Sequence, residues 1–236
     1  MKLQKKKKIA NELENNKQEL VIILVNPQLG NNIGSVARVM ANFSLFKLRL
    51  VNPRSGWLNS ETYSSSSGAS AIIDNAGVFD DVKSAISDLD FVYATTARRR
   101  DIIKEVLSPR SAALEIRPDI NLGKKIGILF GGEKSGLSNE ELAYTDKIIT
   151  SPVNPSFASL NLAQAVNIFS YEYYLTGEID ALGRVTESDR GRLEGLSSDK
   201  TKNASKKEYI HFMEFIEGAL METGFFDMPE KKKLML

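Results

Sequence analysis

Short apolar runs rich in β-branched residues recur along the chain, and a turn signal follows each run. A strand that is apolar on both faces is buried on both faces, as in a parallel sheet covered by helices. The runs lie at 20–25, 47–51, 90–94, 125–130 and 146–150. The pattern therefore predicts several buried strands of one sheet.

Between these runs, apolar residues recur at helical spacing. One stripe consists of Ile33, Val36, Ala37, Met40 and Phe43. A second stripe, which predicts another helix, consists of Val78, Val82, Ala85 and Ile86. The alternation of strands and helices predicts an α/β fold, with a mostly parallel sheet flanked by helices.

The two ends of the chain lack this alternation. Residues 1–18 are polar and charge-rich, which predicts an N-terminal tail ahead of a main domain at 19–176. Residues 177–206 are polar and rich in Gly and Ser, as in a linker. Apolar positions then predict one amphipathic helix at about 207–222, within a C-terminal helical extension at 207–236. A single helix cannot form its own core, so it must pack on the main domain or on a second copy.

Composition narrows the chemistry. The chain has 236 residues, no cysteine and one histidine. The absence of cysteine excludes disulfides, thiolate metal sites and cysteine nucleophiles. His211 is interpreted as structural, and we expect no metal site. No apolar run is as long as a membrane span, so we expect a cytoplasmic protein that does not enter a membrane.

The formal net charge of +1 argues against a surface that is basic throughout. Binding to nucleic acid would therefore depend on local clusters. The candidates are Lys5 to Lys8, Arg98 to Arg100, and Lys231 to Lys233. We interpret the terminal lysines as solvated tails.

Three polar segments follow predicted strands, and ligands bind at that edge of open α/β sheets. The first, "NPQLGNNIGSVARVMANF" at 26–43, places Asn32 as a helix cap and Gly34 where another backbone can approach closely. Arg38 is expected to project from about the first turn of this helix. Taken alone, the segment indicates a capped helix with a surface arginine.

The second segment, "ILFGGEKSGLSNEEL" at 128–142, is rich in glycine. Leu137 stands where a phosphate loop needs its lysine, so nucleoside triphosphate binding is rejected, and the dinucleotide pattern is absent. Ser138 and Glu141 have the spacing of a capping box. The residues alone are equally consistent with a ligand site and with a glycine-loosened turn.

The third segment is "SPVNPSFASLNLAQAVNIFSYEYYL" at 151–175. Pro152 and Pro155 predict an extended loop, and Ser159 and Asn161 lie at the cap of the next helix. Asn161 and Gln164 form a weak capping box. By itself this segment indicates only a capped helix.

Together, in this order and spacing, the three segments resemble the motifs of the SPOUT superfamily of RNA methyltransferases. The similarity is greatest to the branch that methylates ribose 2′-hydroxyls, and within it to the TrmJ-like tRNA methyltransferases. The residues that carry it are Asn32 to Arg38, Phe130-Gly131 with Glu133, Ser135 to Leu142, and Ser159 to Ala163 with Ala165-Val166. Gly132 departs from the arginine that is frequent at this position in that branch.

The resemblance implies a SPOUT fold with a C-terminal trefoil knot, S-adenosylmethionine as cofactor, and a homodimer whose active sites combine residues of both protomers. TrmJ-like enzymes act on tRNA at the first nucleotide of the anticodon loop, position 32, on cytidine, uridine or both. The resemblance implies that the cofactor contacts Thr95, Thr96, Ala97, Gly131, Ser151, Ser159, Leu160 and Asn161.

For catalysis, the resemblance implies Arg38, assisted by Ser159, Asn32 and Glu133. A guanidinium is a poor base because its pKa is above about 12. Our hypothesis is therefore that Arg38 clamps the target phosphate and passes the ribose proton towards it. Arg98, Arg99 and Arg100 would add contacts to tRNA phosphates, together with Arg38.

Several alternatives stay open at this point. The absence of cysteine excludes pyrimidine C5 methylation through a thiol adduct. A SPOUT enzyme acting on another RNA site or on a base nitrogen remains, although an acidic proton acceptor would then be expected in place of Arg38. A knotted RNA-binding module without activity is the alternative from another class.

Overall fold

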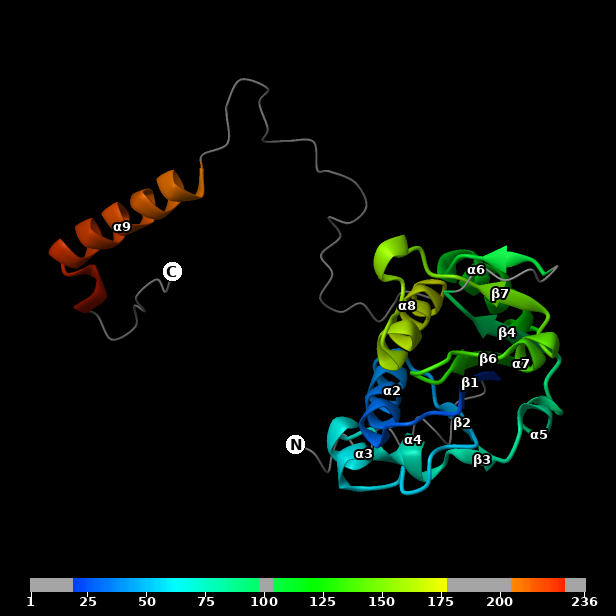
Figure 1. Cartoon of the computed structure of the whole chain (residues 1–236). Helices are drawn as coiled ribbons and strands as arrows, with labels where there is room; N and C mark the ends of the chain where they lie inside the picture. The colour runs from blue at the N-terminus through cyan, green and yellow to red at the C-terminus, as the bar shows by residue number, and fades with distance from the viewer. Residues whose placement is uncertain (1–18, 98–103, 178–204, 228–236) are drawn as a thin grey trace. The chain divides into compact units, whose positions relative to one another are not determined.

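The computed structural model describes residues 19–97, 104–177 and 205–227 (Figure 1). The chain divides into two compact units, Met1–Ala181 and Leu182–Leu236. The predicted tail at 1–18 and all but the ends of the predicted linker at 177–206 lie outside the described residues.

The first unit is built on a seven-stranded sheet whose order is β3-β2-β1-β6-β4-β7-β5. Each pair of neighbouring strands is parallel, which confirms the predicted parallel sheet. The strands are β1 (Leu20–Val25), β2 (Lys47–Val51), β3 (Gly77–Phe79), β4 (Phe91–Thr95), β5 (Val106–Leu107), β6 (Ile126–Gly131) and β7 (Lys147–Ile149). The five predicted runs match five of these strands to within one residue at each end.

The register of the central strands brings their carboxyl ends together. Val25, the last residue of β1, is paired with Val51 of β2 and with Gly131 of β6. Thr95, the last residue of β4, is paired with Phe130 of β6. The loops that follow these strands therefore leave the sheet side by side, at the edge where parallel sheets bind ligands.

Helices cover both faces of the sheet, and alternate residues of β1 show this. Ile22 and Leu24 belong to one buried cluster, together with residues of three long helices, whereas Val21 and Ile23 belong to a second cluster. The long helices are α2 (Gly30–Asn42), α6 (Pro109–Asn121) and α8 (Leu162–Leu175). The short helices are α3 (Ser60–Ser65), α4 (Ser70–Asp74), α5 (Val82–Ile86), α7 (Asn139–Ala143) and the 3-10 turn η1 (Pro155–Phe157). Figure 1 shows α2 and α8 on one side of the sheet, with α5 and α7 on the other.

The second predicted helical stripe was wrong at its first residue. Val78 lies in β3, where it is paired with Leu50 of β2, and the helix begins only at Val82. Val78 is 55% exposed, and β3 is an edge strand. The apolar residues that suggested one helix therefore belong to a short strand followed by a short helix.

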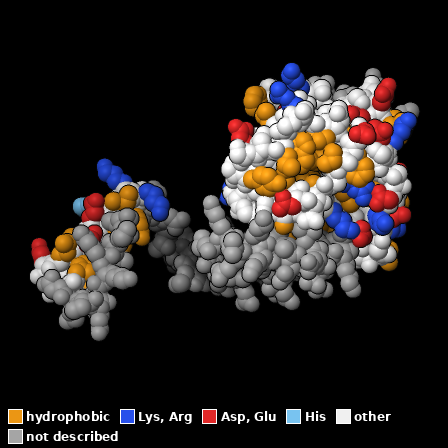
Figure 2. Space-filling view, turned by 90° about the horizontal axis from the view of Figure 1, so that it is seen from below, with side chains coloured by type: hydrophobic (Ala, Val, Ile, Leu, Met, Phe, Trp, Pro, Cys, Tyr) orange, Lys and Arg blue, Asp and Glu red, His pale blue; other side chains and the backbone are white. Residues whose placement is uncertain are grey.

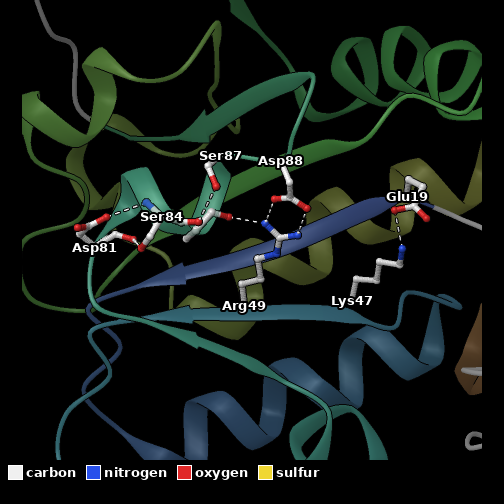
Figure 3. A network of polar contacts seen from close by, with 8 residues as sticks. Glu19, Lys47, Arg49, Asp81, Ser84, Ser87 and Asp88 are labelled. Atoms are coloured by element: carbon white, nitrogen blue, oxygen red, sulfur yellow. Dashed lines mark hydrogen bonds and ion pairs between the residues drawn. The ribbon is translucent and has the colours of Figure 1, made fainter.

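A polar network fastens the segment after α5 to the sheet (Figure 3). Arg49 of β2 donates to the carbonyl oxygen of Ala85 at 2.5 Å and to both carboxylate oxygens of Asp88, at 2.6 and 2.9 Å. These donated hydrogen bonds lower the pKa of Asp88. Lys47, on the same strand, pairs with Glu19 at 2.5 Å. The contacts of Arg49 hold α5 and the residues after it against β2.

The described part of the second unit is helix α9 (Lys206–Glu222) with the turn η3 (Phe225–Asp227). The predicted helix at 207–222 is confirmed to within one residue. Ser205 and Glu208 form a capping box at its start. No residue of α9 is buried, and Phe212 and Phe215 are 57% and 71% exposed.

Hydrophobic side chains also reach the surface of the first unit, where Figure 2 shows them gathered on one face among acidic and basic groups. None of the described helices has both the length and the apolar character needed to cross a bilayer.

Candidate active site

The three polar segments of the sequence meet in space, and Asn32 joins them. Its side-chain amide nitrogen donates to Glu133 Oε1 at 2.7 Å, and its oxygen accepts from Asn161 Nδ2 at 3.1 Å. Asn32 is 8% exposed. These residues are about 100 or more positions apart in the sequence, so the two hydrogen bonds hold three separate loops against one another.

The structure corrects the predicted role of Asn32 as a helix cap. Helix α2 has Leu29 at its N-cap position, without a side-chain cap, and Asn32 lies inside the first turn. Glu133 lies at this helix end instead, where its carboxylate accepts from the backbone amides of Gln28 at 2.9 Å and Leu29 at 3.3 Å. A carboxylate near a helix amino terminus is favourable because of the helix dipole. Glu133, from a distant loop, thus interacts with the start of α2, and the side chain of Asn32 links the loops instead.

The surroundings of Glu133 favour its ionised form. Partial burial alone would raise the pKa of this carboxyl, but the hydrogen bonds from Asn32 and from the backbone amides outweigh it and lower the pKa. Glu133 is therefore a fixed anion that accepts hydrogen bonds from protein groups.

Gly34 is needed for close packing, as expected, but the neighbour is part of the protein. A Cβ at Gly34 would overlap the backbone of Thr62 and the side chain of Ser65, both in α3. The absence of a side chain therefore lets α2 and α3 pack in contact, and this glycine does not open a surface for RNA.

The glycines of the second segment close a compact loop after β6. The amide of Gly136 donates to the carbonyl of Gly132 at 3.0 Å, and Gly136 has a φ of 65°, in the left-handed region that favours glycine. A Cβ at Gly131 would overlap the backbone of Gly136 and Leu137. The predicted capping box of Ser138 and Glu141 is confirmed at the start of α7.

The third segment runs from β7 to α8. Pro155 begins the η1 turn, where the Asn154 side chain accepts from the amide of Ser156 at 3.0 Å. The predicted capping box is confirmed. The side-chain oxygen of Asn161 accepts from Ala163 N at 2.9 Å, and the backbone amide of Asn161 donates to Gln164 Oε1 at 3.2 Å. Asn161 therefore both caps α8 and binds Asn32.

A cavity of about 320 Å³ lies between the second and third segments and the end of β4. Seven of the eight residues predicted to contact the cofactor line it, and the eighth, Asn161, lies next to the lining residue Leu160. The seven are Thr95, Thr96, Ala97, Gly131, Ser151, Ser159 and Leu160. Apolar walls come from Phe130, Ile149, Val153, Leu162, Ala165 and Phe169. A largely apolar cavity with a few polar groups is typical of a small-molecule site.

The arginines predicted to bind RNA and to act in catalysis are not among the described residues that line the cavity. Arg38 was expected at about the first turn of its helix, but α2 begins at Gly30 and places it in the third turn. It is exposed and donates to Ser67 Oγ at 3.3 Å. It is not among the residues that line the cavity of its own chain. Arg98, Arg99 and Arg100 lie outside the described residues.

Sequence reasoning missed Lys134, which lines the cavity beside Glu133. The available signal was its position: a cation in a glycine-rich loop, immediately after an acid identified as a site residue.

Comparisons with known proteins agree with this geometry. The tRNA (cytidine/uridine/adenosine-2′-O-)-methyltransferase TrmJ of Pseudomonas aeruginosa is 34% identical over 215 residues, which are 91% of this chain and 82% of that protein. The crystal structure of TrmJ from Z. mobilis is 40% identical with a TM-score of 0.62, covering 89% of this chain and 82% of its own. A structure that concerns 2-OH methylation of C/U34 on tRNA is 26% identical with a TM-score of 0.53, covering 69% of this chain and 100% of its own.

The model of the SpoU rRNA methylase family matches residues 19–171, a segment that contains the whole sheet, the cavity and all three loops. The relative from Pseudomonas aeruginosa is similar over a longer part of the chain, 215 residues. The chain therefore belongs to the SpoU rRNA methylase family.

Proposed function

We propose that this chain is an S-adenosylmethionine-dependent tRNA methyltransferase that modifies a ribose 2′-hydroxyl. The observation that carries the proposal is the junction at Asn32, which ties Glu133 and Asn161 together beside a cavity lined by the residues expected to hold the cofactor. The name of the relative from Pseudomonas aeruginosa supports the same reaction.

The cavity suits this cofactor in size and chemistry. About 320 Å³ is within the range of small-molecule sites, roughly 300–1,000 Å³. Phe130, Ile149 and Leu162 offer apolar surface to an adenine ring. S-adenosylmethionine would supply an electrophilic methyl group. The protein would hold the ribose oxygen in line with that group and help remove its proton.

Arg38 is proposed to bind the target phosphate and to pass the ribose proton towards it. Because Arg38 does not line the cavity of its own chain, we propose that a second copy of the chain delivers it there, in a homodimer. Helices α2 and α8 bury Ile33, Val36 and Phe169 in the core. They also leave side chains at the surface, among them Tyr171, which is 49% exposed.

The organisation of the chain is proposed as follows. Residues 19–176 form the methyltransferase domain, 177–206 a linker and 207–236 a helical extension, with a trefoil knot in the carboxyl part of the domain. The site of action would be the cytoplasm, where tRNA is modified.

We propose position 32 of the anticodon loop as the target. The test is mass mapping of nucleotides after incubation of a tRNA transcript with the protein and S-adenosylmethionine. We expect one methylated ribose at position 32, and no methylation of a matched tRNA whose nucleotide 32 is a 2′-deoxynucleotide. Methylation at position 34 would contradict the position alone. Methyl groups on a base would contradict ribose methylation, and the absence of transfer would contradict the enzyme.

The role of Arg38 has its own test. Arg38→Ala should lower methyl transfer at least about a hundredfold, in the range seen when a group acting on the transition state is removed. Calorimetry should show nearly unchanged binding of S-adenosylmethionine, and Arg38→Lys should recover little activity because lysine lacks the planar pair of donors. Turnover within a fewfold of wild type in Arg38→Ala would contradict this role.

A further inference from the structure

The charged residues that line the cavity differ in whether they already have hydrogen-bond partners. Among the described residues that line it, two carry a charge, Glu133 and Lys134. The carboxylate of Glu133 accepts hydrogen bonds from Asn32 and from the amides of Gln28 and Leu29. Lys134 is exposed and makes no hydrogen bond or ion pair with the described residues. The charge that is available to a reactant is therefore positive.

The backbone around Lys134 is held in place on both sides. Its neighbour Glu133 is bonded to the start of α2, and the loop is closed by the hydrogen bond from Gly136 to Gly132. Lys134 therefore extends from a well-anchored loop, and its side chain is exposed to solvent while the residue lines the cavity. A cation in such a place binds an anion with a small loss of backbone entropy.

The chemistry of the acceptor decides which anion lies there. In RNA the 2′-oxygen and the 3′-phosphate are on adjacent carbons of one ribose. When the 2′-oxygen enters the cavity to reach the methyl group, this phosphate must lie at the rim. The polar groups Thr95, Ser151 and Ser159 that also line the cavity are neutral, so they offer the phosphate no opposite charge.

We propose that Lys134 binds the phosphate that adjoins the methylated ribose, from the same chain that holds the cofactor. This inference rests on the proposed function and adds a substrate-binding residue to it. It differs from the proposed role of Arg38, which does not line this cavity in its own chain and would reach the same phosphate from a second copy. Lys134 orients the acceptor sugar and takes no part in proton transfer.

The test compares Lys134→Met with Lys134→Arg and with Lys125→Met in the full-length protein. Lys125 is an exposed lysine that precedes β6, whereas Lys134 follows the same strand at the opposite edge of the sheet. Each Met variant removes one positive charge and keeps a side chain of similar length. The measurements are tRNA affinity as a function of salt, and calorimetric affinity for S-adenosylhomocysteine.

We expect Lys134→Met to weaken tRNA binding roughly tenfold at low salt, as for the loss of one hydrogen bond to a charged group. The slope of log affinity against log salt should become shallower by about 0.7 to 1, because one fewer phosphate is neutralised. Lys134→Arg should retain the wild-type slope, and cofactor affinity should change less than twofold in all variants.

Two results would overturn the inference. One is a Lys134→Met variant whose tRNA affinity and salt slope equal those of Lys125→Met. The other is a loss confined to S-adenosylhomocysteine, which would assign Lys134 to the cofactor's carboxylate. Failure of the proposed function is seen separately, as wild-type protein that transfers no methyl group to tRNA.

Discussion

At the scale of single residues, the site depends on an amide that is both donor and acceptor. Asn32 donates to Glu133 through its nitrogen and accepts from Asn161 through its oxygen. An aspartate has nearly the same shape but cannot donate when ionised. The identity of this residue therefore decides whether the second and third loops can share one anchor.

Asn32→Asp should lower the free energy of unfolding by about 2 kcal/mol, because a hydrogen bond to a charged partner is lost and two carboxylates face each other. Asn31→Asp is the matched control, since Asn31 is exposed in the same first turn, where an acid interacts favourably with the helix dipole. Urea unfolding at pH 7 measures the free energy of unfolding of both variants. If the two variants were equally stable, Asn32 would not be the anchor described here.

Glu133 gives the fold a pH dependence of known sign. Its pKa is lower in the folded chain than in the unfolded chain, mainly through the donated hydrogen bonds that outweigh burial. Its ionisation therefore stabilises the fold above the unfolded pKa of about 4.3, and the contribution is lost as pH falls through the lowered folded value.

The difference in unfolding free energy between wild type and Glu133→Gln should consequently shrink as the pH is lowered from neutral to below 4. Urea titrations across this range measure it, with Glu140→Gln, an exposed acid in α7, as the control. A difference that stays constant with pH would show that the charge of Glu133 is not what stabilises the loops.

Single residues also mark the limit of what the sequence could predict. Capping boxes at Ser138 and Asn161 are local patterns and are confirmed. The partner of Glu133 depends on a contact across about 100 residues, so Asn32 was interpreted from local pattern as a cap. Lys134 was missed because no local rule distinguishes a lysine beside a cavity from a solvated one.

At the scale of elements, strands with a full apolar run were predictable and short edge strands were not. β1 and β6 are six residues long and buried along nearly their whole length. β3 and β5 have three and two residues, which is too few to show a period. Their formation depends on pairing with β2 and β7, and sequence pattern does not encode that neighbour.

Helices α6 and α8 are joined by one arginine. Arg117 donates to the carbonyl oxygen of Tyr173 at 2.7 Å and to Thr176 Oγ1 at 2.9 Å, and its guanidinium lies 3.7 Å from the centroid of the Tyr173 ring. Thr176 is the C-cap of α8, where a positive charge complements the helix dipole. One side chain thus caps α8 and fixes it against α6.

Arg117→Ala should therefore destabilise the chain by about 2–4 kcal/mol, since two charge-assisted hydrogen bonds and a partly buried cation–π contact are lost together. Arg110→Ala, an exposed position in the same helix, should change stability by less than about 0.5 kcal/mol. Chemical unfolding monitored by circular dichroism measures both variants. Equal midpoints would show that α6 and α8 are held together by apolar packing alone.

At the scale of the whole molecule, the fold class followed from the alternation of apolar runs, but the strand order did not. β6 lies between β1 and β4, although 100 residues, 26–125, separate it from β1 in the sequence. Local periodicity reports which residues are buried and says nothing of which strands are neighbours. The proposed knot is a still more global property, and here only the family resemblance suggests it.

The division of the chain into two units predicts that the first unit folds without the second. Among the described residues, both buried clusters lie wholly between Leu20 and Tyr173, whereas α9 buries no residue. A chain that ends at Gly177 should therefore fold, with a thermal midpoint within about 3 °C of the full-length protein, since roughly 1 kcal/mol corresponds to about 2–4 °C at this size. Calorimetric affinity for S-adenosylhomocysteine should be unchanged, because every residue that lines the cavity is retained. A markedly lower midpoint would mean that the extension stabilises the methyltransferase domain. Sedimentation of both chains would then tell whether it does so within one chain or across a dimer.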